Sequence, residues 1–109
     1  MKYPDVLSLY QSKRGRDNGA PVTVGNNRTL RKLGDGTLVI ALHGHDLLQY
    51  KTDGRYFARD AGYVTSTTYK VLNEFKPDGY TIYRRGGVGK IITPHGGTAE
   101  VSNTDMVEI

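Results

Sequence analysis

Short apolar stretches separated by glycine-containing turns run through most of this 109-residue chain and limit its fold more than any other feature. Residues 37–42 place Leu38, Ile40 and Leu42 at every second position, which is the spacing of a strand with one buried face. Residues 29–33 precede them, and Gly34-Asp35-Gly36 lies between the two stretches. This pattern predicts a β-hairpin.

Two further hairpins are predicted from the same kind of pattern. Asp53-Gly54 separates residues 47–51 from residues 55–59, and Asp-Gly tolerates the positive φ angles of a type I′ turn. Gly86-Gly87 separates residues 80–85 from residues 88–93 in the same way. Six strands are therefore expected.

One helix is predicted between the second and third hairpins. Thr65 or Ser66 is a suitable N-cap, Lys76-Pro77 ends the segment, and Tyr69, Leu72 and Phe75 form one apolar face at three-residue spacing. We expect residues 65–75 to be the only long helix and to pack on the sheet. The predicted fold is α+β, with antiparallel β-hairpins forming a sheet in the order β-β-β-β-α-β-β.

The chain has the length of one domain, and we assign that domain to residues 28–93. Without cysteine, it has neither disulfides nor thiolate metal sites, and its fold depends on packing. Residues 1–27 are rich in glycine and polar groups and are predicted to be a loose, irregular arm. Residues 94–109 are predicted to be a flexible tail.

Charge is unevenly distributed along the chain, whose formal net charge is +4. Residues 1–34 contain seven Lys and Arg against two Asp, whereas residues 94–109 contain three acidic residues and no Lys or Arg. The arm is therefore basic and the tail acidic, and a basic arm suits a polyanionic partner. No apolar run approaches the roughly 18 residues of a membrane span, and the first residues do not resemble a signal peptide, so we expect no membrane association and a cytoplasmic location.

Two short motifs invite chemical interpretations that we do not favour. Residues 86–90, Gly-Gly-Val-Gly-Lys, lack the spacing and the following helix of a phosphate-binding loop, so we expect a hairpin turn there. His43 and His45 could begin a metal site, but the remaining histidine lies in the predicted tail, so we expect a polar turn. We accordingly expect no catalytic residues, no metal and no cofactor.

Aromatic and basic residues alternate in two segments, residues 55–59 and residues 80–85. Aromatic rings stack on nucleic-acid bases while Arg and Lys neutralise phosphates, so this mixture is typical of a single-strand binding surface. Strand alternation places Tyr83 on the face opposite Tyr80 and Ile82. The predicted nucleic-acid-binding residues are Lys13, Arg14, Arg16, Arg31, Tyr83, Arg84 and Arg85.

Several segments resemble a family of small uncharacterised proteins encoded by tailed bacteriophages. They are Leu42-His43-Gly44-His45-Asp46, Asp53-Gly54, Gly62-Tyr63, and the run from Thr67-Thr68 through Asn73 and Phe75 to Pro77, within about residues 25–93. The family pattern prefers Trp at the position of Tyr63 and Thr at that of His45. The resemblance implies a phage origin, with a role in the infected host cytoplasm or in the virion, and it assigns no functional residues.

We therefore expect a small non-enzymatic binding protein whose partner is single-stranded nucleic acid. Two alternatives involve a host or phage protein as the partner. The chain would then be a phage inhibitor of a host enzyme or defence complex, or a minor structural protein of the virion. The sequence sets no oligomeric state.

Overall fold

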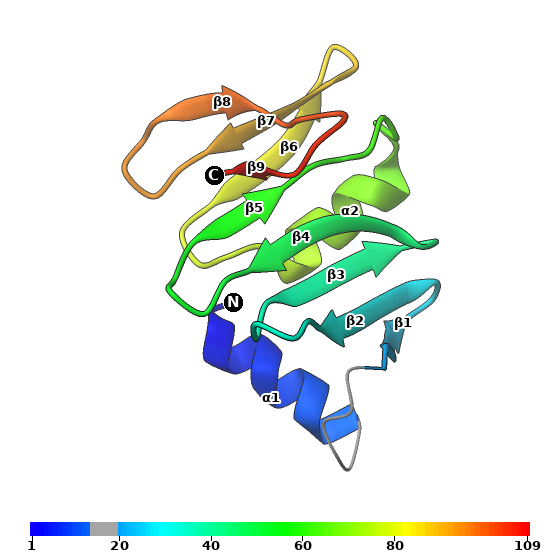
Figure 1. The fold of residues 1–109 in the computed structure, drawn as a ribbon. Coiled ribbons are helices and arrows are strands. Elements are labelled where there is room, and N and C mark those ends of the chain that lie inside the picture. Colours follow the sequence, from blue (N-terminus) through cyan, green and yellow to red (C-terminus); the bar gives the residue numbers. More distant parts are fainter. Residues whose placement is uncertain (14–19) are drawn as a thin grey trace.

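A computed structural model describes residues 1–13 and 20–109, and within these residues it contains two α-helices and nine β-strands (Figure 1). All strand pairs are antiparallel, so the predicted α+β class is confirmed. A six-stranded sheet has the order β1-β2-β3-β4-β5-β9, and a three-stranded sheet has the order β6-β7-β8. The elements are α1 (Tyr3–Lys13), β1 (Val22–Gly25), β2 (Arg28–Lys32), β3 (Leu38–Leu42), β4 (His45–Tyr50), β5 (Tyr56–Ala58), α2 (Ser66–Phe75), β6 (Thr81–Arg85), β7 (Val88–Ile92), β8 (Thr98–Glu100) and β9 (Val107–Glu108).

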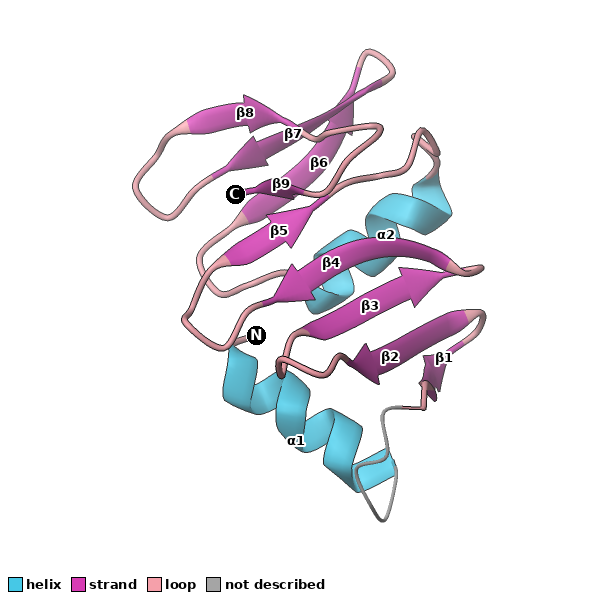
Figure 2. Cartoon of the chain, viewed as in Figure 1, coloured by secondary structure: helices cyan, strands magenta, loops and turns pink. Residues whose placement is uncertain are grey.

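The core lies on the face of the six-stranded sheet that α2 covers (Figure 2). Leu38, Ile40 and Leu42 of β3 point to this face at the predicted two-residue spacing and are buried. α2 begins as expected, because the Thr65 side chain accepts a hydrogen bond of 3.2 Å from the Thr68 N–H and caps the helix. The helix contacts β3, β4 and β6, so it joins the two sheets.

The three hairpin turns β2–β3, β4–β5 and β7–β8 share one geometry. In the turn before β5, the Lys51 N–H donates to the Arg55 carbonyl at 2.9 Å, and Gly54 has a φ of 91°. Only the glycine has a positive φ, whereas a type I′ turn needs two such residues, so the predicted type I′ turn at Asp53-Gly54 is wrong. The Asp53 carboxylate instead accepts the Arg55 N–H at 3.1 Å and stabilises a longer, three-residue loop.

The first residues form a helix, in contrast to the predicted loose arm. α1 has 11 residues, so α2 is not the only long helix. Val6 and Tyr10, one helical turn apart, are fully buried, and the helix contacts β1, β2 and β3. The Asp5 carboxylate accepts the Lys2 N–H at 2.8 Å, which satisfies one donor at the start of the helix. Residues 22–25, also predicted to be irregular, form the edge strand β1.

The last residues also pair with the sheets, unlike the predicted flexible tail. β8 pairs with β7, and β9 pairs with β5. Val101 is buried, and the Tyr80 hydroxyl donates to the Ile109 carbonyl at 3.0 Å. The tail therefore closes the space between the two sheets.

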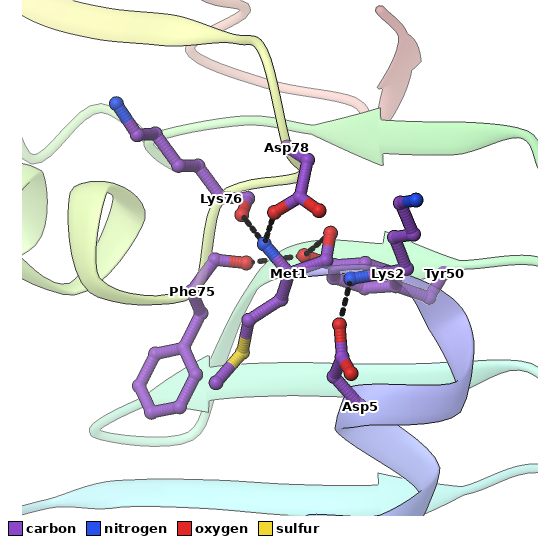
Figure 3. A network of polar contacts seen from close by, with 7 residues as sticks. All are labelled: Met1, Lys2, Asp5, Tyr50, Phe75, Lys76 and Asp78. Carbon is purple, nitrogen blue, oxygen red and sulfur yellow. Dashed lines mark hydrogen bonds and ion pairs between the residues drawn. The ribbon is translucent and has the colours of Figure 1, made fainter.

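The N-terminus is held against the end of α2 by a network of polar contacts (Figure 3). The Met1 ammonium donates to the Lys76 carbonyl at 2.8 Å and pairs with the Asp78 carboxylate at 2.5 Å. This ammonium group lowers the pKa of Asp78. The Tyr50 hydroxyl donates to the Phe75 carbonyl at 2.5 Å, and burial raises the pKa of Tyr50. These contacts link α1, β4 and α2.

Tyr69 connects α2 to both sheets. Its hydroxyl donates to the buried Asp60 carboxylate at 2.7 Å, and burial together with this bond raises the pKa of Tyr69. The ring lies against Gly89 of β7, where a Cβ atom would overlap the Tyr69 hydroxyl and lie 2.6 Å from the ring carbon Cζ. A residue without a side chain is therefore needed at this position.

Neither of the two described helices, which have 11 and 10 residues, is long and apolar enough to cross a membrane.

Truncation of Leu72 tests the packing of α2. Leu72 is fully buried, so Leu72→Ala should lower the free energy of unfolding by about 2 to 4 kcal/mol through lost burial and a residual cavity. Chemical denaturation measures this change. Lys70→Ala, on the exposed side of the same helix, is the control and should change stability by less than about 0.5 kcal/mol. Equal effects of the two variants would contradict the placement of the helix.

Gly89→Ala tests the contact between Tyr69 and β7. Overpacking should lower the free energy of unfolding by about 1 to 3 kcal/mol, since the new methyl group displaces the Tyr69 ring from Asp60. Gly34→Ala is a matched control, because a Cβ atom at Gly34 meets no atom within 4 Å. Thermal unfolding of both variants measures the difference, and an unchanged midpoint for Gly89→Ala would contradict the contact.

Candidate functional site

A groove of about 380 Å³ lies between the β3–β4 turn and the start of α2. Both segments lie at the same side of the molecule (Figure 1). Leu42 and Leu47 form its apolar floor, and His43, His45 and Tyr63 lie around it. Its helical side is formed by Thr65, Thr67 and Thr68. We call this site the His43–Tyr63 groove.

The strand geometry explains how β3 and β4 contribute to the groove. His45 pairs with Leu42 across the hairpin, so both side chains point to the face that α2 covers. The pairing then shifts by one residue, because Asp46 pairs with Ala41 and Leu48 with Ile40. Leu47 is the extra residue of this β-bulge, and it is buried together with Leu48. Simple alternation from His45 would have placed Leu48 on the opposite face.

A tight turn brings Tyr63 beside His45. Ala61 and Gly62 have φ angles of 58° and 84°, and the Tyr63 N–H donates to the Asp60 carbonyl at 3.0 Å. The ring centroids of His45 and Tyr63 are 4.9 Å apart with a 44° tilt. Tyr63 is nevertheless 50% exposed, so much of its ring is free to contact a ligand.

The groove has no acidic side chain in its lining. The carboxylate next to His45 in sequence, Asp46, lies on the other face of the sheet and accepts two hydrogen bonds from Arg31, of 2.7 and 2.9 Å. This ion pair lowers the pKa of Asp46 and raises that of Arg31. Arg84 does not line the groove, but its Nη1 donates at 3.3 Å to the carbonyl of Val64, which lies between groove residues Tyr63 and Thr65 in the chain.

The predicted nucleic-acid-binding residues that the structure describes lie on different surfaces. Lys13 ends α1, at the opposite end of the molecule from the β6–β7 turn (Figure 1), and Arg14 and Arg16 lie outside the described residues. Arg31 is engaged by Asp46. The register of β6 and β7 places Tyr83 and Arg85 on the exposed face of the three-stranded sheet and Arg84 on the opposite face.

The groove was not among the predicted binding residues, although sequence signals for it existed. In the sequence, His43 and His45 suggest only a weak metal pair, and Tyr63 stands out only within the phage-family resemblance. Three segments of the phage-family resemblance, around His43-Gly44-His45, Gly62-Tyr63 and Thr67-Thr68, all contribute to this groove.

The segments considered as a possible metal site and as a possible phosphate-binding loop both form hairpin turns. His43-Gly44 joins β3 to β4, and Gly86-Gly87 joins β6 to β7 as expected. Within residues 1–13 and 20–109, no three His, Cys, Asp or Glu side chains are grouped to hold a metal ion. Comparisons with protein-family models, with curated proteins and with solved structures found no match to this chain.

The ion pair between Arg31 and Asp46 predicts a pH dependence of stability. Because Arg31 lowers the pKa of Asp46, the ionised carboxylate stabilises the fold above a pH of about 4, and this contribution is lost as the pH falls through the lowered pKa. Asp46→Asn should therefore lower the melting temperature at pH 7 and make its decrease between about pH 5 and pH 2 shallower. Thermal unfolding across this pH range measures both effects.

Asp105→Asn is the matched control for this pH series. Asp105 is exposed and has no ion pair among the described residues, so its replacement should leave the pH profile close to that of the unmodified chain. An Asp46→Asn profile parallel to the unmodified one would contradict a stabilising ion pair.

Proposed function

We propose that the protein binds single-stranded nucleic acid and holds one base in the His43–Tyr63 groove. The observation that carries this proposal is the half-exposed Tyr63 ring, held 4.9 Å from the His45 ring at the edge of an apolar floor. Exposed aromatic rings of this kind provide stacking surfaces for unpaired bases.

The size and lining of the groove support this ligand class. Its volume of about 380 Å³ lies within the roughly 300–1,000 Å³ of small-ligand pockets, which is room for a nucleotide but not for a duplex. Leu42 and Leu47 offer apolar contact to a base, and the exposed Thr67 hydroxyl can exchange hydrogen bonds with its edge. A nucleic-acid base, with its flat apolar faces and polar edge, suits this combination of apolar and polar groups.

Charge also favours an anionic ligand. The chain has a net charge of +4, no carboxylate lines the groove, and Arg84 bonds the Val64 carbonyl between two groove residues. Phosphate neutralisation by Arg and Lys supplies much of the affinity in non-specific nucleic-acid binding. A phage origin, a host-cytoplasmic or virion location and a non-enzymatic role are part of the same proposal.

Replacing the stacking ring tests the proposal. Tyr63→Ala should weaken binding to a fluorescently labelled oligothymidine or oligouridine by about 5- to 150-fold, since one base–aromatic stack contributes about 1 to 3 kcal/mol. Fluorescence anisotropy at low salt measures the dissociation constant. Circular dichroism checks that the variant remains folded.

Tyr83→Ala is the matched control, because Tyr83 is also an exposed tyrosine but lies on the other sheet. It should change the affinity less than twofold. A larger loss with Tyr83→Ala than with Tyr63→Ala would move the binding site to the three-stranded sheet. If no oligonucleotide binds at low salt, the nucleic-acid function is wrong, and a host or phage protein becomes the better partner.

A further inference from the structure

We propose that Arg84 contacts the backbone phosphate next to the base held in the groove, so that the strand leaves the groove past the Val64 carbonyl. This assignment rests on the proposed nucleic-acid function. It adds the residue that contacts the nucleic-acid backbone and the side of the three-stranded sheet along which the nucleic acid runs.

The position of Arg84 relative to the groove is the first support. Its guanidinium bonds the Val64 carbonyl at 3.3 Å, and the residues on either side of Val64 both line the groove. Arg84 pairs with Gly89, whose missing side chain leaves room for Tyr69, so Arg84 lies on the α2 side of β6. A phosphate adjoining a base stacked on Tyr63 is therefore within the region that this arginine can reach.

The free charge of Arg84 is the second support. Among the other described arginines, Arg28, Arg31 and Arg55 have carboxylate partners and Arg59 bonds two backbone carbonyls. Within the described residues Arg85, like Arg84, has no ion pair, but it lies on the other face of the three-stranded sheet. Arg84 is exposed and forms no ion pair within the described residues. The Val64 bond uses one of its five N–H donors and orients the guanidinium, which leaves donors for a phosphate.

Arg85 provides a matched control within the same strand. It follows Arg84 directly, is also exposed, and points to the opposite face of the three-stranded sheet with Tyr83. Replacing either residue with Gln removes the same charge from nearly the same place. Only the side of the sheet differs between the two variants.

The test is a salt series on the full chain with a labelled single-stranded oligothymidine. Arg84→Gln should reduce the slope of log Kd against log salt concentration by about 0.7, the value for one lost phosphate contact on a single strand, while Arg85→Gln should leave it unchanged. Arg84→Lys should keep the slope because it keeps the charge. Tyr63→Ala should weaken binding without changing the slope.

An uncharged methylphosphonate oligothymidine separates charge from stacking. Arg84→Gln and the unmodified chain should bind it equally, whereas Tyr63→Ala should still bind it more weakly. Equal slope changes for Arg84→Gln and Arg85→Gln would overturn the assignment, because they would indicate general electrostatic attraction of the strand and no specific phosphate contact by Arg84.

Binding that depends on Tyr63 but not on Arg84 would overturn the assignment while leaving the proposed function intact. No binding by the unmodified chain at low salt would overturn both. Thermal unfolding of each variant shows whether a loss of affinity reflects a loss of folded protein.

Discussion

The buried hydrogen bond between the Tyr69 hydroxyl and the Asp60 carboxylate lies where α2 and the two sheets meet. Tyr69 belongs to α2, Asp60 follows β5 of the six-stranded sheet, and the ring lies on Gly89 of the three-stranded sheet. A carboxylate that is 1% exposed needs hydrogen-bond donors in place of water, and it receives them from Tyr69 at 2.7 Å and from the Gly62 N–H at 2.9 Å. Loss of either donor would leave an unfavourable buried group, so the three parts are held in one arrangement.

Asp60 also stabilises the turn that leads into the candidate site. The Asp60 carboxylate accepts the Gly62 N–H and the Asp60 backbone carbonyl accepts the Tyr63 N–H, and these two bonds fix the turn that presents Tyr63 beside His45. Thr65 then caps α2 only two residues later, which places the first turn of the helix along the groove. Hydrogen bonds within the chain thus hold the Tyr63 ring and the first turn of α2 beside the apolar floor. The groove therefore depends on the same turn and helix cap that position α2 against the core.

Local patterns predicted the hairpins, the Thr65 cap and the buried face of α2, because each depends on residues a few positions apart. α1 was missed, since its buried contacts come mainly from Val6 and Tyr10, and the glycine-rich, polar residues that follow dominate the composition. β9 was missed because it is two residues long and pairs with β5 about 50 positions earlier. The groove was missed for a similar reason: His45 and Tyr63 are 18 residues apart and meet only through a β-bulge and a tight turn, neither of which has a sequence signature strong enough to predict. Fold class is therefore more accessible from sequence than a site built from several segments.

Strand alternation explains why the basic and aromatic cluster of residues 80–85 does not translate into one surface. Tyr83 and Arg85 share the exposed face of the three-stranded sheet with Lys90, whose charge is met by Glu100 at 3.2 Å. Arg84, between them in sequence, lies on the other face and reaches the backbone between two groove residues. Arg84 and Arg85 are adjacent in sequence but lie on different surfaces, since successive side chains of a strand point to opposite sides of the sheet. The surface to which a charge or ring belongs therefore depends on the face on which its side chain lies more than on its neighbours in the sequence, and on the α2 side Arg84 bonds the carbonyl between two groove residues.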